Sequence, residues 1–203
     1  RPGMPIWPGD PEVKLEKIAS IEQGDGANIT QIQMCVHTGT HIDAPRHFLA
    51  EGKTVDTLAI NALMGDVLVM AFEKEVDTIT ARVLAEHQSL PELKNAQRVL
   101  FKTRNSDLWG SHPHTFQEDY VGLDASGANF LSRFNLSLIG LDYLSIAAYQ
   151  DTHQPHQILL SREIILLEGI NLSGVAPGAY QLLCAPLLIA GCEGAPARVF
   201  LTA

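Results

Sequence analysis

The chain has 203 residues, of which 46% are hydrophobic, which suits one domain with a sizeable core. Its formal net charge is −9 at pH 7, and its 14 Lys and Arg residues form no cluster. This balance argues against nucleic acid or an anionic membrane as the main partner. No apolar run could cross a bilayer and no signal peptide is evident, so we expect a cytoplasmic protein. Residue 1 is Arg rather than Met, which leaves the native N-terminus open.

The opening segment, residues 1–11, is rich in Pro and Gly and cannot form a helix. It also contains Ile6 and Trp7, which favour order over a disordered tail. We therefore predict an extended N-terminal arm. Residues 31–36 alternate polar and apolar side chains, which predicts a half-buried strand that runs directly into His37.

The rest of the chain contains more predicted strands than helices. Strands are predicted over residues 65–72, 98–103, 136–141, 163–167, 180–186 and 198–202. Helices are predicted from a cap at Thr78 or Thr80 to about His87, over residues 125–134 and over residues 156–161. Because strands and helices do not alternate strictly, we predict a single mixed α/β domain of α+β type over residues 1–203.

Three cysteines, Cys35, Cys184 and Cys192, are an odd number with no spacing typical of disulfides or metal knuckles. We interpret them as reduced thiols.

The most informative stretch runs from His37 to His47 and contains three imidazoles and one carboxylate. Neutral imidazole with carboxylate is a ligand set for Zn²⁺, Mn²⁺ or Fe²⁺. Gly39 and Pro45 make a helix improbable, and on an extended segment His41 and Asp43 point the same way. We therefore predict a metal site built on His37, His41 and Asp43. The alternative is a set of surface or capping histidines on a loop.

A metal site also needs ligands from elsewhere in the chain. His153 and His156 are two candidates, and Glu168 follows the apolar run of residues 164–167. A carboxylate at the end of a buried strand needs a partner. The alternative for Glu168 is a strand end that reaches solvent beside Gly169.

The run HTGTHIDAPRHF, residues 37–48, closely resembles the HxGTHxDxPxHF signature of the cyclase family. This family includes bacterial-type kynurenine formamidases and isatin hydrolases. The resemblance extends over nearly the whole chain, through the PGMPIWPGDP opening, residues 138–142, the spacing from His156 to Glu168 and residues 178–186. It implies an α/β domain with a β-barrel-like mixed sheet flanked by a few helices.

The resemblance also implies roles for particular residues. It makes His37, His41 and Asp43 ligands of a first metal, and it makes His156 and Glu168 ligands that complete a binuclear site. The twelve-residue spacing to Glu168 favours His156 over His153. His47 resembles a proton-shuttling catalytic histidine, and Trp7 a substrate-contacting aromatic residue. The implied cofactor is a divalent metal, Zn or Mn, with one or two ions per subunit.

We therefore expect a metal-dependent amidohydrolase that cleaves an aryl formamide such as N-formylkynurenine with metal-activated water. The alternatives are a hydrolase of a cyclic amide or lactone such as isatin, and a metal-binding module without catalysis. Residues 143–149 differ from the Thr-Pro-Ser segment of formamidases, which leaves the substrate open. The expected partner is a small-molecule substrate. The resemblance also implies a homo-oligomer, a dimer or tetramer, with the N-terminal arm reaching a neighbouring subunit.

Overall fold

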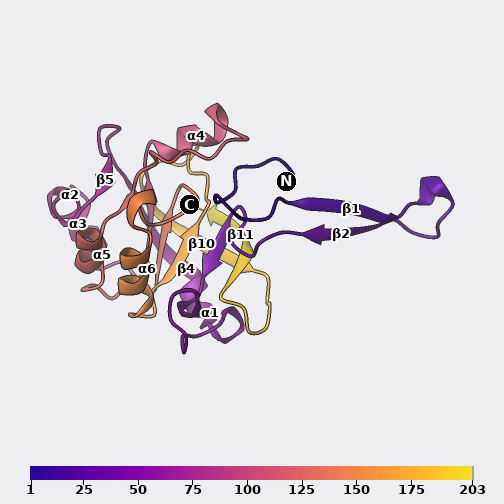
Figure 1. Ribbon diagram of the computed structural model, residues 1–203. Helices are drawn as coiled ribbons and strands as arrows, with labels where there is room; N and C mark the ends of the chain where they lie inside the picture. Colours follow the sequence, from indigo (N-terminus) through magenta and orange to yellow (C-terminus); the bar gives the residue numbers. More distant parts are fainter. Residues whose placement is uncertain (203) are drawn as a thin grey trace.

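A closed barrel of seven strands forms the centre of the protein (Figure 1). The structure is a computed structural model that describes residues 1–202. In order around the barrel, the strands are β10 (Gly178–Pro186), β11 (Gly194–Thr202), β3 (His41–Asp43), β9 (Ile165–Glu168), β8 (Leu138–Leu141), β6 (Arg98–Lys102) and β4 (Met64–Ala71). The pairs β4–β6, β6–β8 and β8–β9 are parallel and the other pairs are antiparallel. The predicted mixed α/β domain with a barrel-like sheet is confirmed.

Six α-helices and two small sheets lie outside the barrel in the described part of the chain. The helices are α1 (Ile60–Leu63), α2 (Ala81–Glu86), α3 (Leu90–Leu93), α4 (Asn105–Ser111), α5 (Ala125–Leu131) and α6 (His153–Leu160). The small sheets pair β1 (Lys14–Ala19) with β2 (Ile29–Gln33), and β5 (Thr78–Ile79) with β7 (Gly122–Leu123). Short 3₁₀ turns are η1 (Ile21–Gln23), η2 (Pro45–His47), η3 (Val55–Thr57) and η4 (Tyr149–Asp151). No helix among residues 1–202 is long and apolar enough to cross a membrane.

Side-chain caps explain where two of the helices begin. The Thr80 hydroxyl accepts a hydrogen bond from the backbone N–H of Val83, so α2 starts at Ala81, as predicted. Asp124 caps α5 in the same way by accepting from the N–H of Gly127. α5 then packs against α2 and α6, and these helices cover one side of the barrel (Figure 1).

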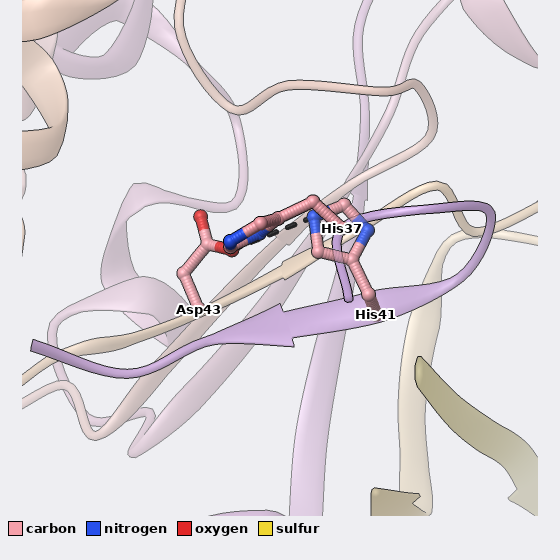
Figure 2. A group of neighbouring side chains, drawn as sticks. All are labelled: His37, His41 and Asp43. Atoms are coloured by element: carbon pink, nitrogen blue, oxygen red, sulfur yellow. Dashed lines mark hydrogen bonds and ion pairs between the residues drawn. The ribbon is translucent and has the colours of Figure 1, made fainter. Parts of the chain in front are cut away.

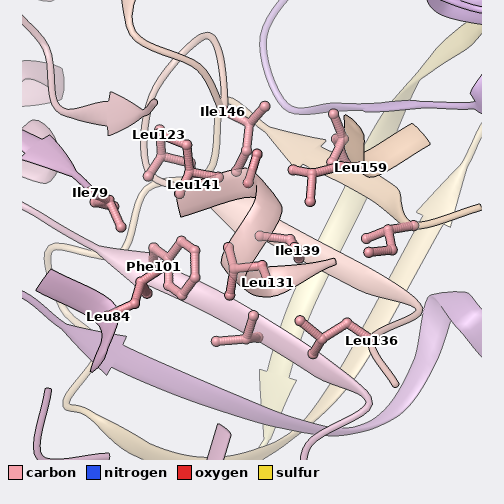
Figure 3. Close-up of a cluster of buried hydrophobic side chains, with 14 of the residues drawn as sticks. Ile79, Leu84, Phe101, Leu123, Leu131, Leu136, Ile139, Leu141, Ile146 and Leu159 are labelled. Carbon is pink, nitrogen blue, oxygen red and sulfur yellow. The ribbon is translucent and has the colours of Figure 1, made fainter. Parts of the chain in front are cut away.

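The hydrophobic core has two main parts, one on each side of the barrel wall. The larger part lies between the wall and the helices and includes Phe101, Leu131 and Ile139 (Figure 3). The second part fills the barrel and includes Ile42, Leu100 and the other inward side chains of the strands. Strands β6, β8 and β9 are buried on both faces, which explains why their sequences are continuous apolar runs rather than alternating ones.

Phe101→Ala is expected to lower the free energy of unfolding by about 3–5 kcal/mol. The Phe101 ring is fully buried and packs edge-on against Phe72, with ring centroids 5.4 Å apart, so truncation leaves a cavity. Urea denaturation followed by circular dichroism measures the change. The control Glu92→Ala, at an exposed helix position, should stay within about 0.5 kcal/mol. A loss at Phe101 no larger than that of the control would contradict the assigned packing.

The strand predicted over residues 31–36 ends earlier than expected, and it is exposed rather than half-buried. β2 ends at Gln33, and all five of its residues are exposed. The reason is that β2 pairs only with β1, in a hairpin that projects from the rest of the protein (Figure 1). Residues 34–36 form no strand before His37. The helix expected over residues 156–161 begins earlier, at His153, and the strand expected over residues 163–167 starts later and includes Glu168.

Residues 1–13 contain no helix or strand and lie against their own chain. The Trp7 ring packs edge-on against Phe116, with centroids 5.2 Å apart, and His114 Nδ1 donates to the carbonyl of Gly3. The segment that projects from the body is therefore the β1–β2 hairpin and not residues 1–11. The three cysteines are free thiols, as expected.

Candidate metal centre

Strand β3 places two polar side chains on the same side of the barrel wall. Ile42 points into the apolar barrel, so its neighbours His41 and Asp43 point outward. On the adjacent strand β9, Glu168 lies directly opposite His41 in the antiparallel register. His41, Asp43 and Glu168 are all buried, with at most 3% of their surface exposed. The solvent-facing alternative for Glu168 is thereby excluded.

Two glycines let the loops at the ends of β3 and β9 pack against each other. Gly39 and Gly169 both have positive φ angles, +74° and +67°. A Cβ at Gly169 would collide with the carbonyl of Gly39. The Thr40 hydroxyl donates to the Gly169 carbonyl over 2.7 Å. This contact fixes the position of His41 relative to Glu168.

His37 approaches Asp43 from the loop before β3 (Figure 2). Its Nδ1 lies 2.7 Å from Asp43 Oδ1, and its ring lies edge-on to that of His41, with centroids 5.1 Å apart. Gly194 on β11 leaves room for the His37 ring, because a Cβ there would lie 2.6 Å from His37 Cε1. The predicted nucleus of His37, His41 and Asp43 is thus a single compact group.

Helix α6 supplies the distant histidine, and it is His156 rather than His153. The Nε2 atom of His156 lies 3.2 Å from Glu168 Oε1 and 3.7 Å from Asp43 Oδ2. His153, at the first position of the helix, is exposed, and its ring contacts Phe48 instead. The two residues lie one helical turn apart; His156 is buried inside the helix, whereas His153 stands at its exposed first position.

Two groups of side chains could each hold a metal ion, and they share Asp43. His37, His41 and Asp43 form one group, while Asp43, His156 and Glu168 form the other. Within each group the donor atoms lie within 4.8 Å of one another. Both groups have the imidazole and carboxylate chemistry that divalent metals accept.

The hydrogen bonding of these side chains fits a metal. Asp43 Oδ2 and His37 Nε2 are buried without a hydrogen-bond partner among the described residues, and such orphaned atoms are costly unless another ligand satisfies them. His41 Nδ1 donates to the Gly39 carbonyl over 2.8 Å, and His156 Nδ1 donates to the Thr152 carbonyl over 2.5 Å. Metal-binding histidines are typically anchored through the second ring nitrogen in this way.

Hydrogen bonds between the imidazoles and the carboxylates shift the pKa values of the group. Burial lowers the pKa of His41, but hydrogen bonds to Asp43 and Glu168 outweigh it and raise the pKa to about 10. For Asp43, burial raises the pKa, but hydrogen bonds from His37 and His41 hold it well below its usual value. The buried carboxylates thus concentrate negative charge that a cation could balance.

His47 belongs to the same pocket but to neither group of candidate ligands. It is the last residue of the η2 turn, and its ring stacks on that of His37, with ring centroids 4.0 Å apart. Burial lowers its pKa below the ordinary value, which favours the neutral imidazole. A neutral imidazole beside a metal site can accept a proton and return it.

A cavity of about 210 Å³ opens over these residues. Trp7 and His47, to which the resemblance gives a substrate-contacting and a catalytic role, both line it. Five further lining residues were missed by sequence reasoning: Asp10, Phe48, Leu144, Ser145 and Thr152. Asp10 lies in the opening segment and Phe48 at the end of the HTGTHIDAPRHF run, so the motifs could have indicated both residues as part of the site. Leu144 and Ser145 follow Asp142 in a stretch with no charged side chain to mark it.

Comparisons with known proteins agree with this geometry. Residues 1–148 match the family model Cyclase, described as "Putative cyclase". The chain is 39% identical to Cyclase-like protein 3 of Oryza sativa subsp. japonica, over 99% of the chain and 76% of the relative. It is 32% identical to the kynurenine formamidase of Erythrobacter litoralis (strain HTCC2594), over 99% of the chain and 89% of the relative.

One solved structure is described as "The Structure Of Potential Metal-Dependent Hydrolase With Cyclase Activity". It matches with a TM-score of 0.82 and 32% sequence identity, over 99% of this chain and 92% of that one. The match spans the barrel, the helices and the segments that carry the candidate ligands.

Proposed function

The chain belongs to the cyclase family of metal-dependent hydrolases, and on that premise we propose that it hydrolyses an aryl formamide or a closely related amide. The observation that carries this proposal is the pair of candidate metal-binding groups that share the buried Asp43 and whose three histidines and Glu168 line a cavity. The proposed ligands are His37, His41, Asp43, His156 and Glu168. When bound, a divalent ion such as Zn²⁺ or Mn²⁺ supplies a Lewis acid that polarises a carbonyl and makes water more acidic.

The proposed role of His47 is to move the proton. It accepts a proton from water as the water attacks the formyl carbonyl, and it donates this proton to the departing aryl amine nitrogen. The products are then formate and the free amine. His47 suits this role because it lines the cavity, and because its lowered pKa keeps the ring neutral near pH 7. A purely structural metal site has no use for such an unligated imidazole.

An aromatic wall supports an aryl substrate. Trp7 lines the cavity, and its ring packs against Phe116 and Tyr149, with ring centroids 5.2 and 5.4 Å away. Leu144 and Phe48 add apolar surface to the cavity. Burial of a planar ring against these side chains contributes to binding and leaves the polar formamide end facing the histidines.

The substrate is tested by measuring formate release from N-formylkynurenine with protein loaded with Zn²⁺ or Mn²⁺. Isatin, whose ring is also opened by attack of water, serves as the alternative substrate. We expect a higher kcat/KM for N-formylkynurenine than for isatin. A metal-loaded protein that hydrolyses isatin faster would overturn the aryl formamide assignment, and one that hydrolyses neither would overturn the amide class.

Gly194→Ala is expected to weaken metal binding by about 10–100-fold, the range seen when residues behind metal ligands are changed. The new methyl group would lie 2.6 Å from His37 Cε1 and 3.0 Å from the Ile42 carbonyl oxygen, so the His37 ring must move. Titration with Zn²⁺ against a competing chelator measures the affinity. Gly110→Ala is the matched control, because its Cβ meets nothing within 4 Å. Equal affinities of the two variants would contradict a role for His37 as a ligand.

A further inference from the structure

One charged side chain that lines the cavity takes no part in the candidate metal centre. Asp10 contributes to the cavity wall, but it belongs to neither group of candidate ligands. Glu168, the other carboxylate on the wall, is paired with His41 and His156. Among residues 1–202, no Lys, Arg or His nitrogen lies within 4.0 Å of the Asp10 carboxylate. Asp10 is thus a negative charge on the cavity wall without a counter-charge in that part of the chain.

A tight turn places Asp10 next to Trp7. The backbone N–H of Asp10 donates to the carbonyl of Trp7 over 3.0 Å, and Gly9 has a φ angle of +97°. Pro8 followed by a glycine with positive φ is typical of a type II turn, whose first and last Cα atoms lie within about 7 Å of each other. The Trp7 ring packs on Phe116, which holds the turn against the body. The turn therefore presents an aromatic ring and a carboxylate side by side to the cavity.

The surroundings of Asp10 favour a cation over an anion. The described residues that line the cavity include no Lys or Arg, so an anionic group near Asp10 would face like charge without a basic side chain to offset it. The Cys35 thiol lies beside the Asp10 carboxylate; burial raises the pKa of this thiol, and the carboxylate raises it further. A neutral thiol is only a weak hydrogen-bond donor, and it leaves the negative charge uncompensated.

We propose that Asp10 binds an ammonium group of the substrate and thereby selects aryl formamides that carry a short cationic side chain. This inference rests on the proposed hydrolysis of an aryl formamide. With the aryl ring against Trp7 and the formamide at the histidines, a short side chain on the ring extends along the turn to Asp10. An alkyl ammonium group is charged at pH 7 and offers three hydrogen-bond donors. Hydrogen bonds between two charged groups are roughly twice as strong as those between neutral groups.

Steady-state kinetics of the metal-loaded protein with two matched substrates test the proposal. N-formylkynuramine carries an ammonium group on its side chain, and o-formamidopropiophenone lacks only that group. The wild type is expected to prefer N-formylkynuramine by about 10–100-fold in kcat/KM, the range of a hydrogen bond to a charged group. The preference should appear in KM rather than in kcat, because the ammonium group stays bound throughout the reaction.

Asp10→Asn is expected to abolish this preference while the metal content stays the same. Asparagine removes the charge, and the turn is closed by the backbone N–H, which asparagine keeps. Asp10→Ser is the second variant, to be used where Asp10→Asn does not fold by circular dichroism. Glu12→Gln is the matched control, because it removes the same charge at an exposed position outside the cavity wall, and it should keep the preference. Calorimetric titration with the product kynuramine should show the same loss of affinity in Asp10→Asn without any turnover.

The possible failures are distinguishable. Equal kcat/KM values for the two substrates in the wild type, or a preference that survives in Asp10→Asn, would overturn the ammonium contact and leave formamide hydrolysis standing. Loss of the preference in Glu12→Gln would replace the contact by a long-range effect of net charge. Loss of metal from Asp10→Asn would make Asp10 a ligand and overturn the proposal as well. Hydrolysis of neither substrate would overturn the proposed function and this inference with it.

Discussion

Asp43→Ala is expected to abolish metal binding and hydrolysis together. Asp43 is the one residue shared by both candidate metal-binding groups, and it is fully buried. Its loss should therefore cost more than the roughly 10–100-fold that is typical for residues behind a ligand. Elemental analysis of the purified variant measures the metal, and formate release measures the activity.

The substitution also leaves His37 Nδ1 without its acceptor, which costs about 1–3 kcal/mol of stability. Asp43→Asn, which keeps the shape of the side chain, serves as the second variant where the alanine variant does not fold. The matched histidine pair gives a further control, because His156→Ala should lose metal while the exposed His153→Ala should keep it. A metal-replete Asp43→Asn protein, or loss of metal in His153→Ala alone, would show that the ligands are assigned wrongly.

His47→Ala is expected to lower kcat by about 10²–10⁴-fold while the metal stays bound. The ring lines the cavity and stacks on His37, but it belongs to neither metal-binding group. Proton transfer is needed in the reaction and not for substrate binding, so KM should change much less than kcat. Steady-state kinetics with metal content measured on the same sample separates the two effects.

The conservative variant His47→Gln separates proton transfer from packing. Glutamine fills much of the space and keeps hydrogen bonds, but it cannot accept and release a proton near neutral pH. It should be nearly as impaired as His47→Ala. Full activity of His47→Ala with metal bound would remove His47 from the proposed mechanism, and full activity of His47→Gln alone would reduce its role to packing.

The strands of the barrel were largely predictable because their environment is simple. β6, β8 and β9 are buried on both faces, so their sequences are apolar runs that stand out from the flanking residues. The three-residue strand β3 was missed, because its two outward side chains, His41 and Asp43, are polar groups of the candidate metal centre and give no apolar pattern. Closure of the barrel through β3 depends on pairing with β9 and β11, which lie more than 120 residues away in the sequence.

The exposed hairpin was misjudged for a different reason. Alternation of polar and apolar residues predicts one buried side, yet the apolar side chains of β2 are exposed within a single chain. The apolar residues of this strand have no surface of their own chain to cover them.

The candidate metal centre was predicted more completely than the cavity around it. Spacing alone placed His41 and Asp43 together, whereas bringing His156 and Glu168 to them required the family signature. Residues such as Ser145 and Thr152 reach the cavity only through the packing of their loops, which local sequence does not encode. Of the two histidine candidates, His156 is buried because it lies one turn inside α6, whereas His153 stands at the exposed start of the helix. This difference could not be read before the start of the helix was known.

Metal content and activity measured on the same purified protein test the central claim most directly. The account predicts one or two divalent ions per chain, loss of N-formylkynurenine hydrolysis after chelation, and recovery on addition of Zn²⁺ or Mn²⁺. Metal content near zero, together with no hydrolysis after either ion is added, would contradict it.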